Sequence, residues 1–112
     1  MKNPPPSPGR PVRGSKTGRP IMVLLDLLGR RWTLRVLWEL REGPLHFRAL
    51  REQCENLSPT VLNRRLGELR EAGIVELGQA GYGLSAEGLD LLASLAPLSR
   101  WAERWRKRMG EE

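Results

Sequence analysis

The sequence predicts a mainly α-helical domain of the α+β class, with a helix-turn-helix, a small β-hairpin and a long C-terminal helix. Apolar residues recur at spacings of three and four through most of residues 21–72 and again near the C-terminus, which is the period of amphipathic helices. A Ser-Pro pair at residues 58–59 marks the start of a helix. Two short apolar runs within residues 74–84 flank a glycine-containing turn, as in a hairpin.

The charge of the chain is unevenly distributed. Its 112 residues carry a formal net charge of +6. Residues 1–20 contain five basic residues and no acidic one, so 14 basic and 13 acidic residues remain for the rest. The same segment is rich in proline and cannot bury enough apolar surface to offset its ordering entropy. We therefore expect a disordered basic tail over residues 1–20, suited to nucleic acid or an acidic membrane surface, and one domain over residues 21–112.

Composition also argues against several classes of protein. The single cysteine, Cys54, cannot form an intramolecular disulfide, and with the single histidine, His46, it cannot complete a structural zinc site. No signal peptide or membrane-spanning apolar run is apparent, so we expect a cytoplasmic protein without a membrane partner. No catalytic cluster or phosphate-binding glycine loop is visible, and we expect neither an enzyme nor a cofactor.

The first predicted helix, residues 21–28, is apolar nearly all round. Ile21, Leu24, Leu25 and Leu28 form one stripe, and Asp26 is its only charged residue. Such a helix must be covered on more than one side. A second subunit could supply the second cover, and an ordinary central core helix is the equal alternative.

A second helix is predicted from residue 32 to residue 41, where a Gly-Pro pair follows. Leu34, Leu37 and Trp38 would share its buried face. Trp32 and Trp38 would then be core anchors.

The central stretch, residues 47–73, predicts two helices joined by a tight corner. The first carries Phe47, Leu50 and Cys54 on one apolar stripe, which predicts that Cys54 is a buried, inert core thiol. The second is expected over Ser58–Ala72, with a serine N-cap, a proline at the first helical position and a glycine just past its end. Its buried side is marked by three leucines, Leu62, Leu66 and Leu69.

The outward face of this second helix carries short hydrogen-bonding side chains at Thr60 and Asn63, followed by Arg64. Such groups can bind base edges and phosphates in a major groove. We therefore interpret the stretch as a helix-turn-helix with a recognition helix, the alternative being a helical hairpin with a solvated face. The residues expected to contact DNA are Arg30, Arg31, Arg48, Ser58, Thr60, Asn63, Arg64 and Arg65, of which Arg65 lies nearer the core edge.

The C-terminal part completes a winged helix arrangement. Residues 74–77 and 82–84 predict the two strands of the wing, joined by an uncharged four-residue turn. Ser85 should cap the last helix, in which Pro97 predicts a kink or a break near residues 95–96. We expect a two-fold dimer through apolar residues of the first and last helices, namely Ile21, Leu24, Leu28, Leu95, Leu98, Trp101 and Trp105.

With these elements in place, the sequence resembles the HxlR family of bacterial transcription regulators, within the MarR-like winged helix group. The residues that carry the resemblance are LDLLGRRW at 25–32, VLWELREGPLHFRAL at 36–50, LSPTVLNRRLGELREAGIVE at 57–76, LSAEG at 84–88 and Trp101. The resemblance implies a homodimer joined by the first and last helices, the recognition helix in the major groove, and the wing against the DNA backbone or minor groove. It also leaves room for an unidentified small-molecule effector.

The sequence departs from the family pattern at two places. Arg19 occupies the position at which members often carry a cysteine, which puts thiol-based sensing in doubt. The wing turn is short and uncharged, which puts wing contact with DNA in doubt.

The predicted function is that of a sequence-specific transcriptional regulator that binds a double-stranded DNA operator as a homodimer. The alternative is a winged helix used for protein contact without specific DNA binding, which the neutral body and the bare wing would favour. The basic tail is expected to compensate for the wing, with Arg10, Arg13, Lys16 and Arg19 along phosphates or in the minor groove. A solubilising tail without contacts is the alternative.

Overall fold

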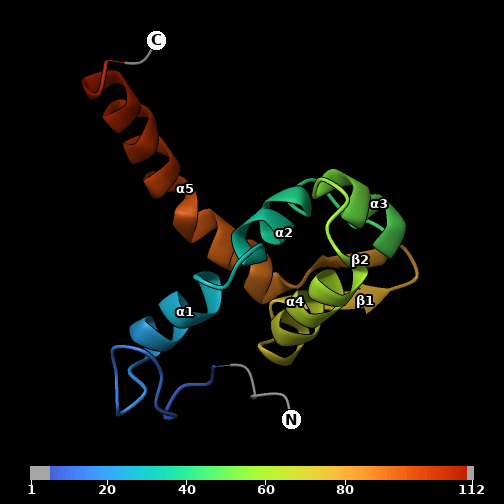
Figure 1. Cartoon of the computed structure of the whole chain (residues 1–112), viewed down its shortest axis with the longest axis horizontal. Helices are drawn as coiled ribbons and strands as arrows, with labels where there is room; N and C mark the ends of the chain where they lie inside the picture. The colour runs from blue at the N-terminus through green and yellow to red at the C-terminus, as the bar shows by residue number, and fades with distance from the viewer. Residues whose placement is uncertain (1–5, 111–112) are drawn as a thin grey trace.

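The structure is a computed structural model that describes residues 6–110 of the chain. Within these residues it contains five α-helices and one antiparallel two-stranded sheet, in the predicted α+β winged helix order (Figure 1). The elements are α1 (Pro20–Leu28), α2 (Thr33–Glu39), α3 (Phe47–Gln53), α4 (Pro59–Glu71), β1 (Val75–Gly78), β2 (Gly81–Leu84) and α5 (Ala86–Arg108). No helix in this part of the chain is long and apolar enough to cross a membrane.

The hydrophobic core lies among the first four helices and the base of the hairpin. The predicted buried side of α4 is confirmed, because Leu62, Leu66 and Leu69 are fully buried. Leu50 of α3 and Cys54 meet them in the same cluster, which confirms the predicted burial of Cys54. Each fully buried leucine contributes about 1.5–3 kcal/mol relative to an exposed one, so this cluster is what fixes α4 on the body.

Helix α1 turns a different face to the core than its apolar stripe predicts. Val23, Leu27 and Leu28 are buried, and Leu28 is only 7% exposed within a single chain. Leu28, which we predicted for the dimer interface, thus packs mainly in the subunit's own core, and its part in an interface stays a prediction. Ile21 and Leu25 remain exposed on the other side of the helix.

The predicted buried face of α2 is wrong for two of its three residues. Leu34 and Trp38 are exposed, Trp38 by 52%, and the Trp38 ring lies 4.1 Å from the guanidinium carbon of Arg41. The buried positions are Thr33, Val36, Leu37 and Leu40. Because α2 is apolar on both sides, its period alone does not indicate which side meets the core. Trp32 is partly buried against the core, with a left-handed φ of 77°.

The turn at the tip of the wing is shorter than predicted. β1 and β2 pair from Val75↔Leu84 to Gly78↔Gly81, which leaves a loop of only Gln79 and Ala80. The base of the wing is tied to the segment before α3, because the backbone N–H groups of Leu45 and Tyr82 donate to each other's carbonyls at 2.9 and 2.8 Å. Gly81 is needed at this junction, since its φ is +108° and a Cβ would lie 2.5 Å from the Leu45 carbonyl oxygen.

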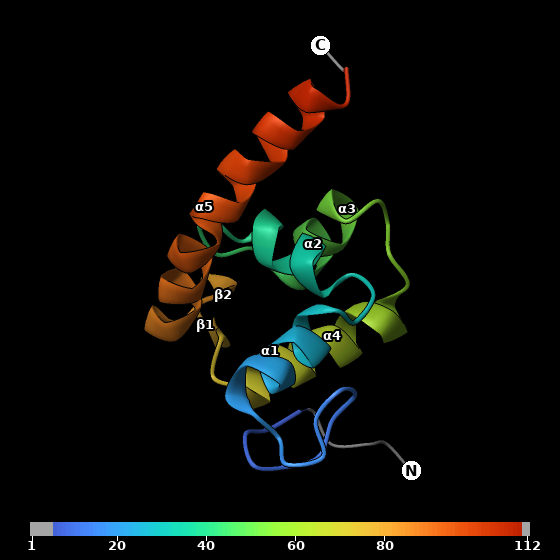
Figure 2. The ribbon, with the colours of Figure 1, turned by 90° about the vertical axis from the view of Figure 1, so that its left-hand side faces the viewer.

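Helix α5 begins as predicted and then continues past Pro97 without a break. The Ser85 hydroxyl accepts a hydrogen bond from Gly88 N at 3.0 Å and donates to Gly73 O at 2.6 Å. Of the predicted kink or break near residues 95–96, the break is wrong. Pro97 and Ala93 are both exposed, so water can solvate the carbonyl that loses its helical donor. The C-terminal half of α5 projects away from the body in both views (Figures 1 and 2).

Residues 6–19, part of the segment predicted to be disordered, form a loop that closes on itself and rests against α1 (Figure 2). Gly9 N donates to Gly18 O at 3.0 Å, and Val12 and Ser15 exchange both backbone hydrogen bonds. Arg13 joins the loop to α1 through an ion pair with Asp26 at 2.9 Å. Residues 1–5 lie outside the described part of the chain, and the division of the chain at residue 20 stays a prediction.

Candidate nucleic-acid interface

The outward face of α4 is polar and unpartnered within residues 6–110. The buried leucines hold the opposite face of the helix against the core. Thr60, Asn63 and Arg64 are exposed, and their side chains make no hydrogen bond or ion pair with the described residues. Gly67 continues this face one turn later, with open space around the position of a Cβ. The side chains that could contact base edges are therefore free to do so. The lack of a side chain at Gly67 would let DNA approach the helix backbone closely.

Three other predicted contact residues flank this face, and they differ in how far their side chains are already engaged within the chain. The Ser58 hydroxyl caps α4, accepting from Val61 N at 3.5 Å. Arg48 on α3 has a 91% exposed side chain and only a loose pair with Glu52 at 3.8 Å, which contributes little. Arg31 is exposed, and its carbonyl accepts a hydrogen bond from Arg65 Nε at 2.7 Å. Arg31 and Arg48 can thus turn toward a phosphate.

Arg30 and Arg65 are placed differently from the other predicted contacts. Both guanidinium groups bind the carboxylate of Glu68 on α4, Arg30 at 2.6 Å and Arg65 at 3.0 Å. Their side chains are only 24% and 15% exposed. Arg30 also lies 3.7 Å from Asp26 of α1. The structure therefore uses these two arginines to join α1 and α4, and their prediction as direct DNA contacts is not supported by this geometry.

The corner between α3 and α4 is strained and clamped by arginines. Glu55 and Asn56 both have left-handed backbone conformations, with φ of 60° and 57°. Such residues cost roughly 1–3 kcal/mol each and persist only where the surroundings enforce them. Arg35 of α2 donates to the Glu55 carboxylate and to the Gln53 carbonyl, both at 2.8 Å. Arg51 Nε donates to the carbonyl just before the α4 cap, that of Leu57, at 2.7 Å.

The sequence alone does not predict these contacts, which hold the corner and α4 in place. Arg35, Arg51 and Glu68 lie on helices that the sequence predicts, but their partners are up to 38 residues away along the chain. No local periodicity signals such pairs. A charged residue at a position facing the core, as Glu68 is on α4, is the one signal that could have been noticed.

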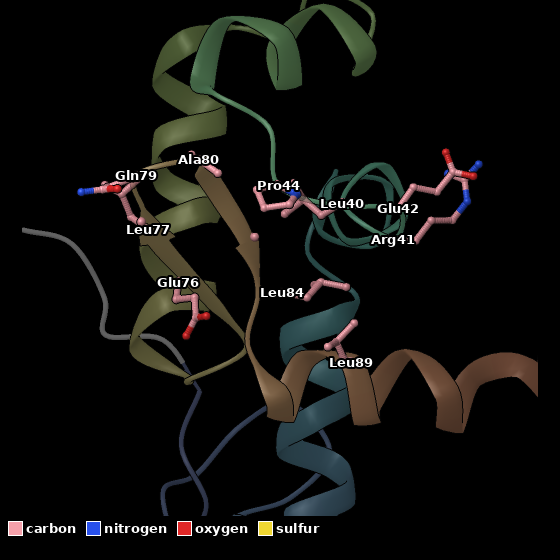
Figure 3. A pocket seen from close by; sticks show the side chains of 14 residues that line it. Leu40, Arg41, Glu42, Pro44, Glu76, Leu77, Gln79, Ala80, Leu84 and Leu89 are labelled. Atoms are coloured by element: carbon pink, nitrogen blue, oxygen red, sulfur yellow. The ribbon is translucent and has the colours of Figure 1, made fainter.

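The wing offers no cation to a phosphate backbone. No lysine or arginine occurs between Arg70 and Arg100, whereas Glu71, Glu76, Glu87 and Asp90 do. An open groove of about 660 Å³ lies between the wing, the loop after α2 and the first turns of α5 (Figure 3). Leu77, Leu84 and Leu89 line it together with Pro44. This side of the wing is thus apolar and slightly acidic.

Cys54 is fully buried at the end of α3, and burial raises the pKa of its thiol. At neutral pH the group therefore stays a protonated and poorly nucleophilic thiol. We expect iodoacetamide to label the native protein only slowly and the urea-unfolded protein rapidly, as mass spectrometry would record. Rapid labelling of the native protein with loss of DNA binding would contradict this expectation.

Within residues 6–110 no group of three or more potential ligands is placed to hold a metal ion.

Comparisons with known proteins identify the family of this chain. The family described as HxlR-like helix-turn-helix matches residues 27–110. The uncharacterized HTH-type transcriptional regulator YvaP of Bacillus subtilis is 31% identical over 88 residues, which are 72% of this chain and 82% of YvaP. The HTH-type transcriptional regulator YodB of the same organism is 30% identical over 87 residues, covering 71% of this chain and 78% of YodB.

Solved structures show the same similarity. The quinone-bound crystal structure of YodB from B. subtilis superposes with a TM-score of 0.71 at 30% identity, covering 76% of this chain and 97% of that chain. A possible HxlR family factor from Thermoplasma volcanium gives a TM-score of 0.64 at 30% identity over 75% of this chain and 82% of that chain. A MarR family regulator from Enterococcus faecalis, 23% identical, shares the fold with a TM-score of 0.73, covering 88% and 96%. The recognition helix, the short wing and the matched residues together place this chain in the HxlR family of helix-turn-helix transcriptional regulators.

Proposed function

We propose that the protein is a cytoplasmic, sequence-specific double-stranded DNA-binding regulator that acts as a homodimer, with α4 in the major groove. The observation that carries this proposal is the outward face of α4. Thr60, Asn63 and Arg64 are exposed and unpartnered within the described residues, on a helix whose other face is fully buried. Arginine and asparagine side chains are the usual bidentate readers of guanine and adenine in the major groove.

The distribution of exposed apolar side chains supports the homodimer. Ile21 on α1 is exposed, and so are Leu98, Trp101 and Trp105 on the projecting half of α5. The two tryptophan rings stack with centroids 5.9 Å apart and planes at 12°. Leu98, Trp101 and Trp105 follow one another along α5 at spacings of three and four, and exposed apolar surface of this kind favours a subunit interface. A two-fold dimer implies an operator with two related half-sites about one helical turn apart, roughly 34–36 Å.

Replacing Arg64 with alanine tests the recognition helix directly. We expect DNA affinity to fall by about 1–3 kcal/mol, since a base or phosphate contact is lost. The free energy of unfolding should be unchanged, because Arg64 is exposed and makes no contact to lose within the described residues. The measurement is fluorescence anisotropy on a duplex that the intact protein has enriched from a random-sequence pool. The matched control is Arg104→Ala, an exposed arginine on α5, and equal affinities for both variants would refute the role of Arg64.

The groove beside the wing, and the lack of lysine and arginine in the wing itself, favour one alternative, a contact with another protein. Ionic strength separates the two functions. DNA affinity should fall steeply with salt, whereas an apolar protein contact should not.

A quinone, the ligand bound in one relative, would find no exposed thiol in the described part of this chain. YodB has been crystallised with a bound quinone. The only thiol of this chain, Cys54, is buried, so a quinone acting on this protein would have to bind without an accessible thiol.

A further inference from the structure

The N-terminal loop, residues 6–19, carries charge that the family match does not account for. The match begins at residue 27, beyond the loop. Residues 1–20 hold +5 of the net charge of +6, and the rest of the chain is nearly neutral. A regulator that binds a polyanion needs cations near it, and the wing supplies none.

The structure gives the loop a fixed shape. Gly9, Gly14 and Gly18 have φ of +86°, +81° and +71°, which permit its tight turns. The Ser15 hydroxyl accepts from Arg19 N at 3.0 Å and so closes the loop onto the start of α1. A Cβ at Gly18 would collide with the backbone at Arg10, so the two ends of the loop are in close contact.

A chain of ion pairs attaches this loop to the recognition helix. Arg13 binds Asp26 at 2.9 Å, and Arg30 lies between Asp26 and Glu68, 3.7 Å from the former and 2.6 Å from the latter. Arg65 completes the chain on α4. The loop therefore lies on the side of α1 that adjoins α4, and Figure 2 shows it below both helices. Arg13, expected from the sequence to bind phosphate, has an internal partner instead.

The other cations of the loop remain free for an external anion. Arg10, Lys16 and Arg19 are exposed, and their side chains make no hydrogen bond or ion pair with residues 6–110. Because α1 is expected at the dimer interface, the two loops of a dimer would lie near the two-fold axis, between the recognition helices. With the two recognition helices in successive major grooves, that position would face the phosphates of the central base pairs of an operator.

We propose that the loop is a second DNA-binding element, in which Arg10, Lys16 and Arg19 neutralise phosphates between the two half-sites and replace the contact that the uncharged wing lacks. The inference rests on the proposed function. Because phosphate contacts position a protein without reading sequence, the loop should add affinity and salt dependence but no sequence preference.

The test is a salt titration of DNA binding by the full chain and by a variant with Arg10→Gln, Lys16→Gln and Arg19→Gln. Each neutralised phosphate contributes about 0.9 to the slope of log affinity against log salt, so three contacts per subunit predict a slope shallower by up to about 5 units per dimer. The control carries Arg100→Gln, Arg104→Gln and Lys107→Gln, three exposed cations of the projecting half of α5. Its slope should match that of the intact protein. Circular dichroism and sedimentation verify that all three proteins are folded and equally dimeric.

The outcomes separate this inference from the proposed function. A shallower slope for the loop variant alone, with the same preferred sequence, supports the loop as a DNA contact. Selective binding by every protein with parallel slopes overturns the loop and leaves the proposed function standing. Equal flattening by the loop variant and the control also overturns it, since net charge alone would then be responsible. If the random pool yields no preferred sequence, the proposed function fails, and the same titration on a mixed-sequence duplex decides the loop by itself. Binding to phosphatidylglycerol vesicles that only the loop variant loses, with parallel DNA slopes, would assign the loop to a membrane surface and overturn the proposal.

Discussion

Replacing Trp101 and Trp105 together with alanine is expected to turn a dimer at micromolar concentration into a monomer. The two rings stack on each other on a half of α5 that projects from the body, and each is about half exposed in the single chain. Buried interface tryptophans commonly cost about 2–4 kcal/mol when truncated. Because a two-fold interface contains each residue twice, the dimer dissociation constant should rise at least about a thousandfold.

Sedimentation velocity over a range of protein concentrations measures this change. Leu77→Ala is the matched control, since Leu77 is a comparably exposed apolar residue but lies on the wing, away from α1 and the projecting part of α5. The control should stay dimeric. A double tryptophan variant that remains a dimer would place the interface elsewhere, and an intact protein that is monomeric would contradict the homodimer.

Replacing Glu68 with glutamine is expected to lower the free energy of unfolding by about 3 kcal/mol. The substitution keeps the shape of the side chain but removes the carboxylate that binds both Arg30 and Arg65. Two largely buried guanidinium groups would then lack most of their counter-charge, and breaking a buried pair typically costs about 3–5 kcal/mol. The lower end applies because Arg30 keeps its longer contact with Asp26.

Urea denaturation followed by circular dichroism measures this loss. Glu103→Gln provides the comparison, because the pair of Glu103 with Arg106 on α5 is solvent-exposed and should be worth less than about 1 kcal/mol. Similar losses for the two variants would show that the Glu68 cluster is not a specific support of α4.

The recognition helix could be predicted closely because several local signals agree. The Ser58 cap, the proline after it, the leucine period and the glycine past its end all lie within one stretch, and α4 spans Pro59–Glu71 between the predicted caps. The face of α2 could not be predicted in the same way, because Leu34 and Leu37 both look like core residues and only packing decides between them.

Long-range ion pairs limited the prediction of the site. In the sequence, nothing distinguishes Arg30 from Arg64 as a candidate for contact with DNA. Only the fold brings Glu68 to Arg30 and leaves Arg64 without a partner among the described residues. The position of the N-terminal loop against α1 is likewise hidden in the sequence. It depends on the ion pair between Arg13 and Asp26, and the sequence shows Asp26 only as the single acidic residue of an apolar helix.

In the proposed homodimer, the projecting half of α5 would tie the folding of this region to protein concentration. An isolated helix of such length is marginal in water, and most helices in proteins owe their stability to packing. The C-terminal turns carry Leu98, Trp101 and Trp105 on a surface that the rest of the described chain does not cover. These turns should therefore fray in a lone subunit and become helical only as two subunits meet. A subunit without a partner would then expose a frayed end with two tryptophans to proteases, so pairing would also set how long each molecule survives.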